Sequence, residues 1–226
     1  MTTHIKQSII LRMDMGNSKR TEKLRRQYRN ILRRFSNAGN YDGYFIGKVS
    51  LEFNMAADAG KMSENQAHII KSRENYAELA AGGDFADGYL SIHMYLMKPV
   101  SKAAAQSNSG VQNKFAAVNE YTQDMIFSKS EILSFVSDTG DFNPIHQGEH
   151  PVVPGLLIME KLILRKLNVQ TDIGHIGIFD LIHSFIIRFR TPLYADEPVR
   201  LVLHKASGRM DGYKCSDGIQ LFSCKY

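Results

Sequence analysis

The run GLLIMEKLILRKLN, residues 155–168, constrains the fold of this chain more than any other segment. It is strongly apolar, which is typical of a helix buried in a core. The segments DLIHSFIIRFRTPLY, EPVRLVLHKAS and GYKCSDGIQLFSCKY follow it and predict three or four antiparallel strands, the last pair joined around Asp217 and Gly218. A buried helix packed against such a sheet is an α+β arrangement.

Length and composition allow one large domain or two small ones. The chain has 226 residues, 43% of them apolar and 23% charged, which is typical of a globular protein. The Ala, Ser, Asn, Gln and Gly content of residues 101–119 predicts a linker between an N-terminal half, 1–100, and a C-terminal domain, 120–226. No window approaches the roughly 20 apolar residues of a membrane helix, and no signal-peptide pattern is present, so we expect a cytoplasmic protein with no membrane partner.

The two cysteines do not indicate a metal site. Cys215 and Cys224 are nine residues apart, a spacing that matches no zinc motif, and two such cysteines in the cytoplasm are expected to be reduced thiols. We therefore predict neither a metal nor another cofactor.

Apolar periodicity and cap residues predict the remaining elements. In residues 18–35, Leu24, Tyr28 and Ile31 recur at helical spacing while basic residues occupy the other face. Ser128 and Glu131 form a possible capping box for a short helix that ends at Gly140. The other expected elements are strands at 4–13, 41–53, 87–100 and 121–127, and a capped helix at 63–83 that glycine ends.

The stretch SDTGDFNPIHQGEHPVVPGLL, residues 137–157, carries the candidate chemistry. Pro144 fixes one backbone dihedral and biases Asn143 toward an extended conformation, so this turn is stiffer than a generic loop. The carboxylate of Asp141 and the imidazole of His146 can hold a water between them, one moving a proton and the other orienting the water. Such a pair suits hydration or dehydration.

Gly155 adds a third element to this stretch. The first N–H groups of a helix have no partner within it, and a substrate carbonyl can approach the Gly155 N–H because no side chain intervenes. That hydrogen bond would strengthen as negative charge develops on the oxygen. The alternative is an ordinary turn with no catalytic role. In it the Asp141 side chain only caps the turn, His146 is exposed, and Pro154 and Gly155 only interrupt the regular structure.

The sequences TGDFNPIH and VVPGLLIMEKL resemble the signature of the (R)-specific enoyl-CoA hydratases, or MaoC-like dehydratases. Together with FIIRFRTPLYADEPVRLVL the likeness spans roughly residues 121–226. It implies a hot dog fold, in which an antiparallel sheet wraps a long central helix. It also implies that Asp141 and His146 are the catalytic pair and that the Gly155 N–H is the oxyanion donor, with Gly140, Asn143, Pro144 and Pro154 supporting the motif.

The chain departs from the family pattern after His146. Only QGEHPVVP separates His146 from Gly155, where the family usually has a longer segment, and Pro154 stands where the family often has histidine. The start of the apolar helix also lacks a Ser or Thr that could support Asp141. We expect substrate preference to be set at this short bridge.

The N-terminal half contains no second copy of the motif. The family resemblance allows a double hot dog in which residues 1–100 are a degenerate partner that shapes the acyl pocket. The helix at 18–35 does not belong to the simplest hot dog order. Met94, Met97, Met125 and Met159 are expected to fill either the core or the acyl tunnel.

Basic residues are concentrated in the helix at 18–35. They form a solvated face, or attract the phosphates of coenzyme A or an acidic acyl carrier protein, or bind nucleic acid. Nucleic acid is the least favoured partner because no aromatic stacking pattern or helix-turn-helix accompanies the charge. We also expect a homodimer.

Three functions are compatible with these residues. The favoured one is an acyl-thioester hydratase or dehydratase, which adds water reversibly to a trans-2-enoyl thioester of coenzyme A or acyl carrier protein. The alternative is a non-catalytic module that binds acyl thioesters. A hot dog thioesterase is less favoured, since the Asp-Asn-Pro-His order resembles the water-adding branch.

Overall fold

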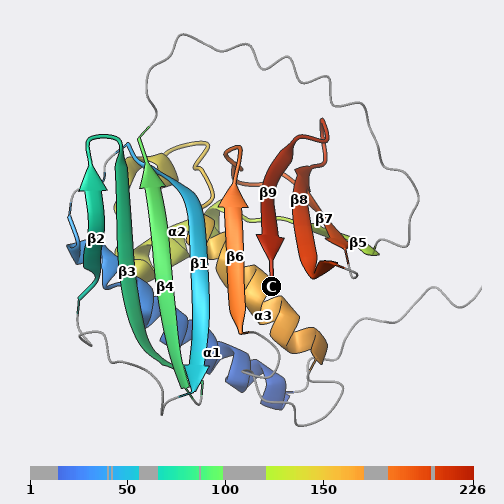
Figure 1. Cartoon of the computed structure of the whole chain (residues 1–226). Coiled ribbons are helices and arrows are strands. Elements are labelled where there is room, and N and C mark those ends of the chain that lie inside the picture. Colours follow the sequence, from blue (N-terminus) through green and yellow to red (C-terminus); the bar gives the residue numbers. More distant parts are fainter. Residues whose placement is uncertain are drawn as a thin grey trace, which may run out of the picture.

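A computed structural model describes residues 15–39, 41, 43–55, 66–86, 88–98, 121–170, 183–204 and 207–226. Within these residues, nine strands form one antiparallel sheet in the order β2-β3-β4-β1-β6-β9-β8-β7-β5 (Figure 1). The strands are β1 (Phe45–Met55), β2 (His68–Arg73), β3 (Tyr76–Phe85), β4 (Gly88–Met97), β5 (Tyr121–Met125), β6 (Ser184–Phe189), β7 (Val199–His204), β8 (Arg209–Lys214) and β9 (Gln220–Lys225). The predicted strand at 4–13 and the predicted linker at 101–119 lie outside the described residues.

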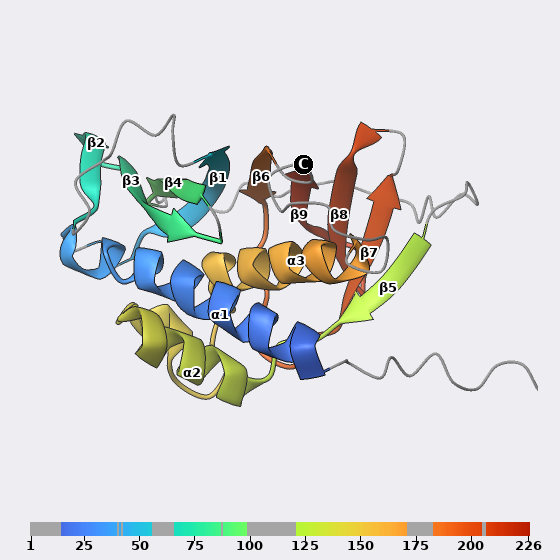
Figure 2. The same cartoon turned by 90° about the horizontal axis from the view of Figure 1, so that it is seen from below.

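Helices cover one face of this sheet. They are α1 (Met15–Leu32), α2 (Lys129–Thr139) and α3 (Gly155–Gln170), with two short 3-10 helices, η1 (Phe35–Asn37) and η2 (Pro144–His146). Helices α1 and α3 lie side by side against the sheet, and α2 lies on their far side (Figure 2). The predicted α+β arrangement is confirmed, and in the described residues no helix is long and apolar enough to cross a membrane.

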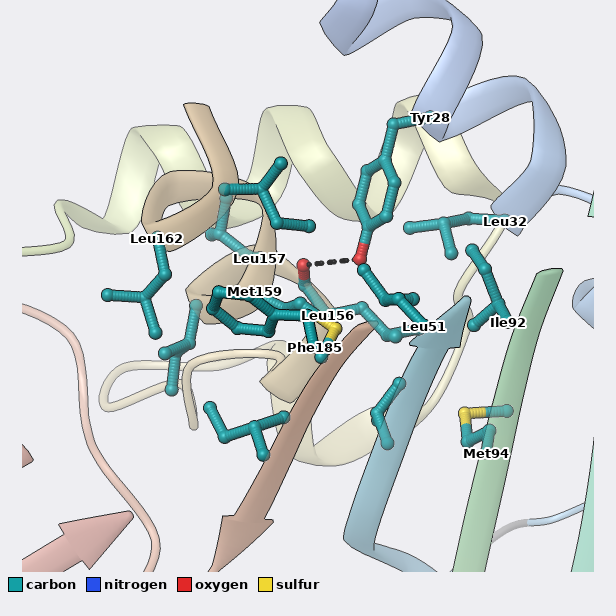
Figure 3. Close-up of a cluster of buried hydrophobic side chains, with 14 of the residues drawn as sticks. Tyr28, Leu32, Leu51, Ile92, Met94, Leu156, Leu157, Met159, Leu162 and Phe185 are labelled. Atoms are coloured by element: carbon teal, nitrogen blue, oxygen red, sulfur yellow. Dashed lines mark hydrogen bonds between the residues drawn. The ribbon is translucent and has the colours of Figure 1, made fainter. Parts of the chain in front are cut away.

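The N-terminal and C-terminal halves share one core. Strand β1 of the first half pairs with β6 of the second, with Leu51 opposite Phe185 and Val49 opposite Ile187. Above this seam, Tyr28 of α1 is buried against α3, and its hydroxyl donates a hydrogen bond of 3.2 Å to the carbonyl oxygen of Leu156 (Figure 3). Burial of this hydroxyl raises the pKa of Tyr28 well above its ordinary value.

The prediction of a helix at 63–83 is wrong. From residue 68 this segment forms the hairpin of β2 and β3, and Ala77, Leu79 and Ala81 of β3 are buried. Cross-strand pairing with β4 along the whole of β3 outweighs the helical preference of this alanine-rich segment. Gly83 does not end a helix either: a Cβ on it would lie 3.0 Å from Ile31 Cγ1, so this glycine allows α1 to pack closely on β3.

The short helix predicted between Ser128 and Gly140 is confirmed, but its capping box is only half formed. Helix α2 begins at its Ser128 cap, whose side chain accepts a hydrogen bond from the Glu131 N–H at 3.2 Å. The second half of the predicted capping box is absent, because the Glu131 carboxylate instead pairs with Lys161 of α3 at 2.7 Å. Gly140 ends α2 in the left-handed conformation with a φ of 69°, which glycine adopts without strain.

Candidate active site

The turn after α2 is held by its own polar side chains and by the N-terminal half. Asn143 caps η2, since its Oδ1 accepts a hydrogen bond from the Ile145 N–H at 3.3 Å, and Pro144 occupies the first position of η2. The Asn143 side-chain amide also donates to the Tyr44 carbonyl oxygen at 3.4 Å. The turn therefore has a fixed position relative to the start of β1.

The structure brings the predicted pair together. His146 Nε2 lies 3.4 Å from Asp141 Oδ2, and the side chains are 8% and 30% exposed, respectively. The other carboxylate oxygen of Asp141 accepts a hydrogen bond from the Asn143 N–H at 3.2 Å, which fixes its orientation. His146 is buried, so the exposed position that the turn-only alternative gave it is wrong.

The tautomer of His146 follows from its second partner. Nδ1 lies 2.7 Å from the carbonyl oxygen of Val152, and because a carbonyl only accepts, Nδ1 donates and carries a proton. In the neutral ring Nε2 is then an acceptor that faces an acceptor oxygen of Asp141. Two facing acceptors suit a water molecule that donates one O–H to each of them.

Gly155 is the first residue of α3, and the Pro154 carbonyl before it accepts from the N–H groups of Leu157 and Ile158 at 3.0 and 3.1 Å. Pro154 is thus the residue before the helix, and the N–H of Gly155 has no acceptor within α3. A Cβ on Gly155 would lie 2.9 Å from Cζ of Phe189, so the ring of Phe189 occupies the space that a side chain would need. Packing on β6 thus gives a second reason for glycine at this position.

One pocket of about 900 Å³ joins these residues to the N-terminal half. The C-terminal half of the chain lines the pocket with Asp141, His146 and Gly155. The N-terminal half contributes apolar walls from helices and strands distant in the chain: Leu32, Phe35, Ile46, Leu79, Met94 and Leu96. Of these walls, the sequence had indicated only Met94, as a residue of the core or the acyl tunnel. Met94 and Met97 line the pocket, whereas Met159 is completely buried in the core.

The bridge QGEHPVVP divides into two parts. Residues 147–150 are exposed, whereas Val153 is buried and its N–H donates to the Leu193 carbonyl oxygen at 2.8 Å. Val152 and Val153 line the pocket, so the second part of the bridge is one of its walls. Phe142, which sequence reasoning also did not identify, lines the pocket while 75% exposed.

The described residues contain no group of three or more His, Cys, Asp or Glu side chains that could hold a metal ion. Cys215 and Cys224 are free thiols, and burial raises the pKa of Cys224 far above its ordinary value.

Solved structures share this architecture at low sequence identity. A MaoC-like dehydratase from Phytophthora capsici is 14% identical, with a TM-score of 0.50, over 83% of this chain and 73% of its own. HtdX of Mycobacterium tuberculosis is 11% identical, with a TM-score of 0.56, over 93% of this chain and 94% of its own. No protein-family model and no curated protein matches the sequence. The predicted hot dog fold is confirmed, and the resemblance to MaoC-like dehydratases extends to the fold.

Proposed function

We propose that this protein is an acyl-thioester hydratase or dehydratase, which adds water to a trans-2-enoyl thioester or removes it from a 3-hydroxyacyl thioester. The observation that carries the proposal is the facing pair of His146 Nε2 and Asp141 Oδ2, 3.4 Å apart in a pocket that Gly155 also lines. A general base, a carboxylate and an N–H at a helix start are the groups that such a reaction requires.

In the hydration direction, the water bound to Asp141 and His146 attacks the β-carbon of the enoyl group. His146 Nε2 takes a proton from this water as the hydroxyl bonds to carbon, and Asp141 stabilises the imidazolium. Electrons move to the thioester oxygen, and the Gly155 N–H stabilises the enolate. The same pair then returns the proton to the α-carbon, so one water adds across one double bond.

The apolar walls of the pocket support an acyl substrate. Leu79, Met94 and Leu96 present no charge to a bound chain, and a pocket of about 900 Å³ has room for more than the thioester group. In this proposal the N-terminal half binds the acyl chain and the C-terminal half supplies the reacting groups. The carrier is coenzyme A or an acyl carrier protein.

A hydratase assay on trans-2-enoyl-CoA with two site variants tests the proposal. Asp141→Asn and His146→Ala should each lower kcat by about 10²- to 10⁴-fold, because each removes a group that moves or orients a proton. His150→Ala is the matched control, since His150 is exposed on the same bridge, and it should retain wild-type rates. Wild-type rates in both site variants would overturn the assignment, and tight acyl-thioester binding without turnover by the wild type would favour the non-catalytic module.

A further inference from the structure

Arg29 of α1 connects α2, which ends two residues before Asp141, with α3, which begins at Gly155. Its guanidinium binds Glu160 of α3 through two hydrogen bonds of 2.8 Å, and it binds Asp138 of α2 at 2.5 Å. The Arg29 side chain is only 13% exposed and Glu160 is 3% exposed. Part of the basic face of α1 is therefore an internal contact rather than a solvated surface.

This contact is specific for arginine. A buried carboxylate such as Glu160 is costly unless it is paired, and the planar guanidinium can meet both of its oxygens at once. Burial by itself would lower the pKa of Arg29, but Glu160 and Asp138 outweigh that effect and raise it, so the guanidinium remains charged. Arg25 adds a weaker hydrogen bond to Glu160 at 3.3 Å.

The contact on α2 lies next to the proposed site. Asp138 is three residues before Asp141, and the N–H groups of Gly140 and Asp141 both donate to the Val136 carbonyl oxygen, at 2.9 and 3.2 Å. Arg33, the residue directly after α1, also donates to the Asp138 carbonyl oxygen. The end of α2, up to Asp141, is thus a compact unit that Arg29 of α1 and the following Arg33 hold at two points.

The contact on α3 lies on the helix that begins at Gly155. Glu160 is five residues along from Gly155, and Tyr28 of α1 binds the carbonyl of Leu156 in the first turn. The same face of α1 therefore fixes both the start of α3 and the end of α2.

We propose that Arg29 is a positioning residue that sets the distance between Asp141 and the Gly155 N–H by tying α2 and α3 to α1. This inference rests on the proposed function, and it gives the N-terminal half a part in the chemistry besides binding the acyl chain. Arg29 does not line the pocket, so in this proposal it acts through the groups that it positions.

Kinetics of Arg29→Met, Arg29→Lys and Asp138→Asn test the role. Arg29→Met should lower kcat by about 10- to 100-fold with KM within about threefold, since small displacements of reacting groups cost rate more than binding. Arg29→Lys should recover part of this loss, because one charged hydrogen bond can re-form. Asp138→Asn tests the α2 contact alone and should fold normally, since Asp138 is 45% exposed.

Lys161→Met is the matched control. Lys161 binds Glu131 at 2.7 Å and so also joins α3 to α2, but at the opposite end of α2 from Asp141. The Lys161→Met variant should have a lower melting temperature than the wild type and an unchanged kcat. Equal kcat for all four variants and the wild type, whatever their melting temperatures, would make Arg29 merely structural and overturn the inference while the proposed function stands.

A measurement without turnover separates the two proposals. The ring nitrogen signals of His146 in ¹⁵N NMR, assigned by their loss in His146→Ala, should move in Arg29→Lys and Asp138→Asn and stay in place in Lys161→Met. Unchanged His146 signals in the first two variants would overturn the positioning role even if the protein hydrates no thioester.

Discussion

Gly155 lines the pocket together with Phe189, whose ring packs against it. A side chain here would have to displace Phe189, because the nearest ring carbon is only 2.9 Å from the position of a Cβ. The residue therefore has a packing role that exists with or without a substrate. The proposed oxyanion role of its N–H is a separate property.

Gly155→Ala tests the packing role. We expect it to lower the free energy of unfolding by about 1–3 kcal/mol, the usual cost of overpacking, as measured by urea denaturation. In a Phe189→Ala background the same change should cost less, because the space is then free. An equal cost in both backgrounds would contradict the packing explanation.

Single residues of the site differ in how well the sequence predicted them. Asp141 and His146 were identifiable because they lie on one stiff turn, five residues apart. The partner of Glu160 was not, since Arg29 lies 131 positions away. A lone acid inside an apolar helix and a cluster of arginines in another were the available signals, but only the fold pairs them.

Among the elements, those with strong local signals were predicted, including the strands β1, β4 and β5, whereas the hairpin of β2 and β3 was not. Helix α3 is apolar and begins at Gly155, directly after Pro154. Strands β8 and β9 meet at a turn in which Gly218 has a φ of 73°. By contrast, β2 and β3 exist because β4 supplies a partner for β3, which is information outside the segment itself. Helix α1 was predicted, but its contact with α2 and α3 was not.

One of the alternatives that the sequence left open, that the basic face of α1 attracts an acidic acyl carrier protein, predicts a docking site on the outer face of α1. Lys19, Arg20, Lys23 and Arg26 are exposed, and Arg26 is six residues, roughly 9 Å along the helix, from Leu32 at the pocket wall. Charge reversal by Arg20→Glu and Lys23→Glu should lower kcat/KM for carrier-bound substrate by about tenfold or more and leave acyl-CoA unaffected.

The control for this experiment reverses Lys71 and Arg73 on β2, which are exposed and change the net charge equally. An equal effect of both charge reversals would point to overall charge instead of a docking site. Faster turnover of acyl-CoA than of any carrier-bound substrate, with no effect of either reversal, would favour coenzyme A as the carrier.

At the scale of the whole molecule, β1 and β6 merge two halves into one sheet, and the pocket draws its walls from both. The linker at 101–119, the division into two domains, the homodimer and the cytoplasmic location stay predictions. The fold itself could be inferred from a motif in the C-terminal half because the buried helix and its strands are local. The position of the N-terminal half over the site depends on contacts across the whole chain.

Hydration of a trans-2-enoyl-CoA in water labelled with oxygen-18 tests the central claim most directly. Mass spectrometry should find one labelled oxygen in the 3-hydroxyl group of an intact thioester, formed by the wild type and lost in His146→Ala. Label in a released carboxylate, together with free thiol, would instead identify a thioesterase and contradict the account.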